Sequence, residues 1–353
     1  CYTESLCLFN TGVNTSKLYR MELFVNKFAT NCKKMSGDEL HTLLDQIHEI
    51  HGFYSPPFLG LAAAVACCAF TFLLGGGPTE MFCAFLGAGA GNYLRAKMNQ
   101  HHLTLFLCTA ASVALACVVY TISFMALKSG FDVSIHHQAG YICSMLFIIP
   151  GFPFITSGID LAKLDMRSGM ERLTYAIIII AVATLTAWML ALVLHLKPMD
   201  FLPLGLNKCQ YLICRLIASF FGVLGFSVMF NSPLRLAATA GLIGAIANTT
   251  RLELVDLASF PPAAAAFLGA LLAGLLASMI KTSIGYPRIS LTVPSIVIMV
   301  PGLYLYRAIY NIGITSINTG AYWFTEAFLI IMALPLGLIF ARIITDKTFR
   351  QCS

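Results

Sequence analysis

Two Pro-Gly pairs occupy equivalent positions in two similar segments of this sequence. Pro150-Gly151 lies in residues 144–180 and Pro301-Gly302 lies in residues 295–331, and these segments align without a gap at an offset of 151 residues. Proline removes a backbone hydrogen-bond donor and clashes with the preceding turn, so each pair is expected to break an apolar helix. The freed backbone groups need protein or water around them. We therefore predict that both pairs lie close together and line a site for a small polar solute; two structural kinks are the alternative.

The motif Asn-x-x-Arg also occurs twice, as Asn92 with Arg95 and as Asn248 with Arg251. Both copies fall at the end of a short apolar stretch rich in small residues. We interpret the asparagines as substrate contacts and the arginines as partners for a carboxylate. The alternatives are arginines that extend to the membrane interface, and a packing role preserved by the common ancestry of the two segments.

Hydroxyl and acidic side chains near the breaks could complete such a site. Ser157 and Tyr304 place hydroxyl groups shortly after the prolines, and Asp160 follows Pro150 by ten residues. Glu326 has apolar neighbours in the sequence. Burial favours the protonated form of a carboxyl group, so Glu326 is the first candidate for proton coupling and Asp160 is the second. A solvated position at the membrane interface is the alternative for Glu326.

Motifs of other functional classes do not occur in the sequence. It contains no G-x-x-x-x-G-K-[ST], H-E-x-x-H or G-x-S-x-G, which argues against ATP-driven transport by this chain alone and against an enzyme. None of the twelve cysteines forms a C-x-x-C pair, and we interpret most of them as small packing residues. His41, His48 and His51 could suggest a metal site, but solvated helix positions are the preferred interpretation. We expect neither a metal nor a cofactor.

These residues must be positioned by helices that lie in a membrane. Hydrophobic residues make up 58% of the chain and charged residues only 11%, which is typical of a polytopic membrane protein. Ten apolar stretches can be distinguished, most of them long enough to cross a bilayer. The predicted spans are residues 57–74, 79–94, 103–127, 139–159, 172–196, 211–230, 234–250, 257–280, 289–307 and 322–344.

The ten stretches form two halves of five that correspond at offsets of about 151–156 residues. An odd number of spans in each half means that the two copies enter the membrane in opposite senses. Sixteen of the 22 Lys and Arg residues fall on the side that bears both ends of the chain, which predicts cytoplasmic termini. The expected divisions are an N-terminal region without its beginning (1–56), a first five-span repeat (57–196), a connector (197–209), a second five-span repeat (210–345) and a cytoplasmic tail (346–353).

The N-terminal region differs from the rest because it is charged and has no long apolar run. Residues 38–50 place Leu side chains at helical spacing, with Ser36 as the expected N-cap and Glu39 three residues later. Residues 18–31 are expected to form another helix. We therefore predict two cytoplasmic helices ahead of the first span.

With these features identified, the chain resembles the threonine/serine exporter family. The resemblance covers nearly the whole chain. Residues 1 to about 195 are similar to the N-terminal exporter domain of the family, and residues 210–345 to its smaller C-terminal domain; the two are fused here. The resemblance implies a ten-span inner-membrane carrier that exports small amino acids with the proton gradient, and it specifies no site residues. The stretches that carry it are IIPGFPFITSGIDL (148–161), FNSPLRLAATAGLIGAIANTTRLEL (230–254) and VPSIVIMVPGLYLYRAIYNI (293–312).

The leading interpretation is a secondary exporter of threonine and serine. A zwitterionic amino acid needs a cationic partner for its carboxylate and an acceptor for its ammonium group, and the motifs above supply both kinds. The interpretation implies protons and the lipid bilayer as partners, no nucleic acid, and is compatible with a homo-oligomer. The alternatives are an exporter of succinate-type dicarboxylates and a non-transporting membrane scaffold or sensor.

Overall fold

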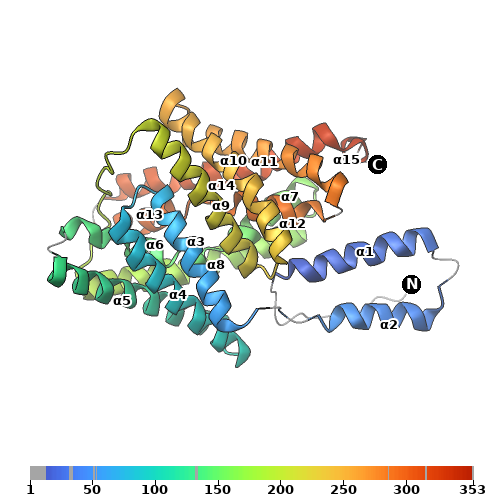
Figure 1. Ribbon diagram of the computed structural model, residues 1–353, viewed down its shortest axis with the longest axis horizontal. Coiled ribbons are helices and arrows are strands. Elements are labelled where there is room, and N and C mark those ends of the chain that lie inside the picture. The colour runs from blue at the N-terminus through green and yellow to red at the C-terminus, as the bar shows by residue number, and fades with distance from the viewer. Residues whose placement is uncertain are drawn as a thin grey trace.

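The computed structural model describes residues 13–31, 35–50, 52, 54–131, 134–284, 286–314 and 316–351. Throughout these ranges the regular structure is helical, so the predicted all-α class is confirmed (Figure 1). Helices α1 and α2 extend away from the remaining helices, which pack into one bundle (Figure 1). His51 lies outside the described residues, whereas His41 and His48 lie in α2.

The two N-terminal helices agree with the sequence prediction. Helix α1 spans Thr15–Asn31 and α2 spans Gly37–His48. Ser36 is the N-cap of α2, and its hydroxyl oxygen accepts a hydrogen bond of 3.2 Å from the backbone N–H of Glu39. This bond satisfies one of the free donors at the start of the helix, which is why the chain turns into α2 at this point.

The bundle contains two series of helices, which are separated in the chain by residues 194–207. The first series is α3 (Pro56–Leu73), α4 (Pro78–Gln100), α5 (Leu105–Phe131), η2 (Ile135–Gly140), α6 (Tyr141–Ser144), η3 (Leu146–Ile148), α7 (Gly151–Ala162) and α8 (Met166–Val193). The second is α9 (Lys208–Met229), α10 (Leu234–Ala258), α11 (Pro262–Ile284), α12 (Arg288–Val297), α13 (Gly302–Ile314), α14 (Ile317–Thr345) and α15 (Lys347–Gln351).

Six to eight of these elements qualify as membrane spans. Six single helices are long and apolar enough, namely α3, α5, α8, α9, α11 and α14, and two bent helix pairs could each form one more span. The chain is therefore a multi-pass membrane protein. The predicted count of ten also included α4 and α10, which have 23 and 25 residues but a lower mean hydropathy. Their charged residues and many small residues explain the difference.

Helices α3 and α9 pack against each other in antiparallel directions at the centre of the bundle. Near the start of α3, Ala62 contacts Gly225, close to the end of α9. At the opposite end of the pair, the rings of Phe72 and Tyr211 have centroids 6.4 Å apart. A Cβ atom on Gly225 would lie only 2.5 Å from the carbonyl oxygen of Ala62, so glycine is required for this close approach.

Small residues also bring α4 close to α5. A Cβ atom on Gly91 would lie 2.7 Å from the carbonyl oxygen of Ser112, and one on Gly87 would lie 2.6 Å from that of Ala116. Both carbonyl groups belong to the backbone of α5 and cannot easily move. Gly87 and Gly91 are therefore positions at which the backbones of α4 and α5 touch.

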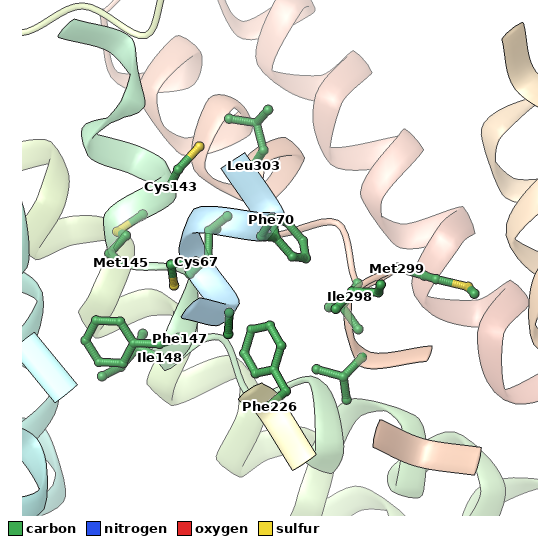
Figure 2. Packing of buried hydrophobic residues seen from close by; sticks show 14 of the residues in the cluster. Cys67, Phe70, Cys143, Met145, Phe147, Ile148, Phe226, Ile298, Met299 and Leu303 are labelled. Carbon is green, nitrogen blue, oxygen red and sulfur yellow. The ribbon is translucent and has the colours of Figure 1, made fainter. Parts of the chain in front are cut away.

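The hydrophobic core joins the central helices to the two broken segments. Figure 2 shows Phe70 of α3 and Phe226 of α9 next to side chains that precede the two Pro-Gly pairs. The two phenylalanine rings meet edge to face with centroids 6.3 Å apart. Phe147 and Ile148 come from the first broken segment, and Ile298 from the second. Packing thus holds both breaks against the α3–α9 pair.

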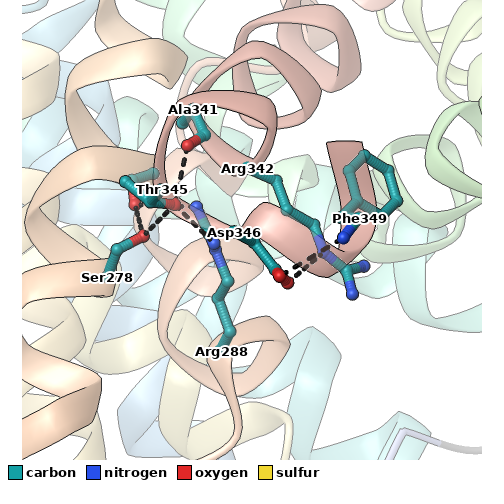
Figure 3. Close-up of polar contacts among 8 residues, drawn as sticks. Ser278, Arg288, Ala341, Arg342, Thr345, Asp346 and Phe349 are labelled. Atoms are coloured by element: carbon teal, nitrogen blue, oxygen red, sulfur yellow. Dashed lines mark hydrogen bonds and ion pairs between the residues drawn. The ribbon is translucent and has the colours of Figure 1, made fainter. Parts of the chain in front are cut away.

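Polar contacts fix the end of α14 to its neighbours (Figure 3). Arg288, the first residue of α12, donates hydrogen bonds to the hydroxyl oxygen of Thr345 at 3.0 Å and to the carbonyl oxygen of Gly274 at 3.2 Å. Arg342 forms an ion pair of 3.5 Å with Asp346. These bonds connect α11, α12 and α14 at the end of the bundle that carries the C-terminus.

Candidate functional site

The two Pro-Gly pairs interrupt two helical segments in nearly the same way. The axes bend by 51° between Tyr141–Ile148 and Gly151–Ala162, and by 47° between α12 and α13. At each break the glycine N–H bonds to the carbonyl group of the residue before the proline, at 2.8 Å for Gly151 and 2.9 Å for Gly302. Each proline carbonyl then accepts the N–H four residues later, at 3.1 Å in both copies. The predicted helix breaks are confirmed.

The two breaks also contact each other. A Cβ atom on Gly151 would lie 3.2 Å from a methyl group of Val300, the residue before Pro301. In return, a Cβ atom on Gly302 would lie 2.3 Å from the terminal methyl group of Ile149, the residue before Pro150. Each glycine therefore gives room to a side chain of the other break. The expected proximity of the two Pro-Gly pairs is confirmed by these reciprocal contacts.

One cavity, called here the Arg95 cavity, lies at the first break and has a volume of about 270 Å³. Asn92, Arg95, Pro150 and Gly151 all line it, so the structure brings these four predicted residues together. The Nδ2 atom of Asn92 donates a hydrogen bond of 2.7 Å to the carbonyl oxygen of Leu59. The other lining residues used below are Phe147, Ile148, Ile149, Tyr175, Ile179, Met229 and Phe230.

A second cavity, called here the Arg251 cavity, lies at the second break and has a volume of about 430 Å³. Arg251, Pro301, Gly302 and Tyr304 line it, which again brings four predicted residues together. The ring of Tyr304 packs edge to face on Trp323 of α14, with centroids 5.2 Å apart. Residues 200–204 of the connector form part of its wall. Further lining residues used below are Leu73, Leu74, Tyr211, Ile298, Met299, Val300, Arg307 and Ile330.

The two cavities lie at opposite ends of the antiparallel α3–α9 pair. The last residues of α9 and the first turn of α3 border the Arg95 cavity, whereas the end of α3 and the start of α9 border the Arg251 cavity. Residues at the same repeat offset line both cavities. Ile179 of the Arg95 cavity and Ile330 of the Arg251 cavity differ by 151 positions, and so do the three residues that precede each proline. Met229 of the Arg95 cavity and Leu73 of the Arg251 cavity differ by 156 positions. The two cavities are thus built from corresponding parts of the two halves.

Neither cavity arginine has a carboxylate partner within the described part of the chain. Arg251 donates one hydrogen bond of 3.5 Å to the carbonyl oxygen of Met299, and its buried Nε atom has no partner. Arg95 makes no ion pair with any described residue, and it interacts electrostatically with the hydroxyl group of Tyr175. A guanidinium group that is removed from water without a counter-ion is costly, about 2.5–3.5 kcal/mol near the bilayer centre. An anion bound in either cavity would relieve this cost.

Two predicted substrate contacts, Ser157 and Asn248, do not line either cavity. The hydroxyl group of Ser157 is buried and bonds to the carbonyl oxygen of Phe154 within its own helix. Asn248 is fully buried and donates to the Oγ atom of Ser219 at 2.9 Å, so it ties α10 to α9 rather than facing the Arg251 cavity. Asn248 therefore differs from Asn92, which does line a cavity.

The two predicted proton-coupling acids also lie outside the cavity walls. Asp160 accepts a hydrogen bond of 2.7 Å from Arg172, which forms an ion pair between α7 and α8. Sequence analysis did not assign this partner to Asp160. Glu326 is half-buried on α14 and lies close enough to Tyr304 for an electrostatic interaction. Its neighbours Phe324 and Phe328 are exposed, so they lie on the outer surface of the bundle.

Sequence analysis missed several polar residues at or near the cavities. Tyr175 lines the Arg95 cavity and occupies the same repeat position as Glu326, so the 151-residue offset could have identified it. Arg307 lines the Arg251 cavity, forms an ion pair of 2.9 Å with Asp200 of the connector, and lies over the ring of Trp323. No sequence signal linked these two charges, because 107 residues separate them.

A buried acid and a histidine were also missed. Glu80, near the start of α4, is almost fully buried, and its Oε1 atom lies 2.6 Å from the Nδ1 atom of His137. The position of Glu80, three residues after Gly77, indicates the start of a helix in the sequence. It does not indicate that Glu80 contacts His137.

Comparison with protein families gives one match in each half of the chain. Residues 1–195 match the family described as "Putative threonine/serine exporter", and residues 215–344 match the family described as "Threonine/Serine exporter, ThrE". The first match alone covers more than half of the chain. No curated protein and no solved structure matched the chain.

Proposed function

Because the chain belongs to the threonine/serine exporter family, we propose that it is a secondary carrier that exports threonine and serine across the inner membrane. The observation that carries this proposal is the matched pair of cavities, each of which ends at a Pro-Gly break and holds an arginine without a carboxylate partner among the described residues. The guanidinium group binds the substrate carboxylate. The hydroxyl groups of Tyr175 and Tyr304, which line the two cavities, accept hydrogen bonds from the ammonium group.

In this proposal the two cavities are the two halves of one transport pathway. The touching breaks close the pathway between them, and substrate crosses when the two halves of the bundle move against each other. The antiparallel packing of α3 and α9 and the matching hydrogen bonds at the two breaks support two repeats of opposite orientation. Helices α4 and α10 then cross the membrane as well, which gives ten spans with both termini in the cytoplasm.

The driving force in this proposal is the proton gradient. The sequence has no nucleotide-binding loop, so an ion gradient must supply the energy for export against a concentration difference. Glu326 is the proposed proton-coupling acid, since it is half-buried and near Tyr304 of the Arg251 cavity. Asp160 is the weaker candidate because its carboxylate is already paired with Arg172.

Export of dicarboxylates is the second candidate, and one observation favours it. The Arg251 cavity is lined by two guanidinium groups, those of Arg251 and Arg307. The carboxylate that pairs with Arg307, that of Asp200, is exposed to solvent. Two cations in one cavity suit two carboxylates. A zwitterion brings one carboxylate to these two cations, and a dianion brings two.

Counterflow in proteoliposomes tests both candidates. Vesicles with purified protein are loaded with unlabelled threonine, serine or succinate, and entry of the same solute in labelled form is measured against protein-free vesicles. We expect counterflow with threonine and serine and none with succinate. Counterflow with succinate alone would replace the first candidate by the second. Protein that moves none of these solutes would support a scaffold or sensor instead.

A further inference from the structure

Asp200 is the one acidic residue among the described residues that line the Arg251 cavity. It lies on the connector, and its Oδ1 atom accepts a hydrogen bond of 2.9 Å from the Nη2 atom of Arg307. Its Oδ2 atom has no partner among the described residues. The side chain of Asp200 is 90% exposed and that of Arg307 is 13% exposed. The carboxylate therefore stands at the solvent side of the cavity, with one oxygen open to an incoming group.

Contacts on two sides fix the position of this carboxylate. The next residue, Phe201, packs against the hydrophobic core, and a Cβ atom on Gly75, which follows α3, would lie 3.9 Å from its side chain. The guanidinium group of Arg307 lies over the ring of Trp323, with 4.9 Å between the guanidinium carbon and the ring centroid. Both Phe201 and Trp323 also line the cavity. The connector and α13 thus hold the ion pair at the cavity wall.

Tyr304 connects this ion pair to the second guanidinium group of the cavity. Its hydroxyl group interacts electrostatically with both Arg251 and Arg307. Arg251 has no carboxylate partner among the described residues, whereas Arg307 has Asp200. The cavity therefore offers one cation without a counter-ion and, at its solvent side, one carboxylate. A molecule with one carboxylate and one ammonium group finds a partner of each sign.

The Arg95 cavity has no counterpart of this ion pair. Its described lining residues include no acid, and Arg95 is the one charged residue among them. At the repeat offset of 151 residues, Arg307 corresponds to Thr156, whose hydroxyl group donates to the carbonyl oxygen of Phe152 in its own helix. The first break forms without a second cation or an acid. The pair of Asp200 and Arg307 is therefore not required for the bend, which points to a role in what the Arg251 cavity admits.

We propose that Asp200 is a specificity-determining residue that makes the Arg251 cavity select zwitterions over dicarboxylates. This inference rests on the proposed transport function. The negative charge of Asp200 attracts the ammonium group of threonine or serine at the solvent side of the cavity. It repels the second carboxylate of a dianion, and it occupies the guanidinium group of Arg307 that this carboxylate would need. A cavity with two arginines is thereby restricted to substrates with one carboxylate.

Competition during threonine counterflow tests this role. Two concentrations are measured at constant ionic strength, namely the threonine concentration that gives half-maximal entry and the succinate concentration that halves threonine entry. Asp200→Asn removes one exposed charge contact that favours threonine and one that opposes succinate. Each such contact changes affinity by about 1.5- to 5-fold, so the ratio of the succinate value to the threonine value should fall by about 2- to 30-fold. Glu171→Gln is the matched control, because it removes an exposed carboxylate that pairs with the exposed Arg167 outside both cavities, and it should keep the wild-type ratio.

The double variant Asp200→Asn/Arg307→Gln shows which cation the gain in succinate binding requires. We expect it to need about as much succinate as the wild type, because the guanidinium group released by Asp200→Asn is then missing. A gain that persists without Arg307 would overturn the inference. An unchanged ratio in Asp200→Asn, or an equal fall in Glu171→Gln, would overturn it as well.

Failure of this inference and failure of the proposed function are separate outcomes. If the wild type moves threonine and Asp200→Asn keeps the wild-type ratio, the transport function stands and the assignment of Asp200 is wrong. If the wild type moves no threonine, the proposed transport function is wrong, and the inference falls with it.

Discussion

A guanidinium group without a carboxylate partner among the described residues lines each cavity. Arg95 and Arg251 stand at equivalent repeat positions, and neither has a carboxylate partner among the described residues. Some other arginines do have such partners. Arg215, for example, pairs with Glu253 and Asp256. Arg95 and Arg251 combine a cavity position with the lack of such a partner, so they are the proposed cations for a substrate carboxylate.

Replacement of a cavity arginine should weaken substrate binding. A hydrogen bond to a charged group contributes about 1.5–3 kcal/mol, so Arg251→Gln should raise the Kd for threonine by about 10- to 100-fold. Arg251→Lys keeps the positive charge but not the planar guanidinium group. Its Kd for threonine should therefore lie between those of the wild type and Arg251→Gln. Arg167→Gln is the matched control, because Arg167 is exposed and pairs only with the exposed Glu171. Unchanged binding by Arg251→Gln, measured calorimetrically in detergent, would rule out this role.

The coupling acid can be tested separately from substrate binding. Glu326→Gln removes the titratable group but keeps the shape of the side chain. We expect it to abolish threonine accumulation driven by an imposed pH gradient, while exchange partly survives because exchange moves no net proton. A Glu326→Gln protein that still concentrates threonine would remove Glu326 from the mechanism. Asp160→Asn would then be measured in the same assay.

Helix packing sets the geometry on which the cavities depend. The glycines of α4 allow its backbone to touch that of α5, and the end of α4 carries Asn92 and Arg95. A helix pushed away from its neighbour would move both side chains away from the first break. The structure thus links a small-residue pattern in the sequence to the position of a cavity arginine.

Added volume between these helices should destabilise the protein. A methyl group on Gly91 would lie 2.7 Å from a backbone oxygen of α5, so Gly91→Ala should cost about 1–3 kcal/mol. Gly130→Ala is the control in α5, since no atom lies within 4 Å of the added methyl group. Thermal unfolding in detergent should show a lower Tm for Gly91→Ala and no decrease for Gly130→Ala. Equal Tm values would mean that α4 and α5 are not in close contact.

The sequence predicted elements better than it predicted side-chain partners. Apolar length and Pro-Gly breaks are local signals, and they identified the long helices and both bends. The repeat offset located Arg95 and Arg251 at their cavities. The partners of Asp160 and Glu80 depend on which helix faces are turned inward, and a near-uniformly apolar helix carries no periodic signal for this orientation.

At the scale of the whole molecule, the account depends on which end of the bundle faces the cytoplasm. The distribution of basic residues predicts that both termini are cytoplasmic and that the connector between the halves is outside. A reporter that is active only in the cytoplasm, fused after Leu204, should therefore be inactive, and one fused after Arg350 should be active. Activity after Leu204 would contradict two five-span repeats of opposite orientation.

Accessibility of the two cavities tests the central claim most directly. Single cysteines at Ile179 and Ile330, which lie at equivalent positions of the Arg95 and Arg251 cavities, would be placed in a protein whose own cysteines have been replaced. A membrane-impermeant thiol reagent should reach Ile179→Cys only from the cytoplasmic side and Ile330→Cys only from the outside. Saturating threonine should change the two labelling rates in opposite directions. Labelling of both positions from the same side, or rates that ignore threonine, would contradict a single pathway with two alternating cavities.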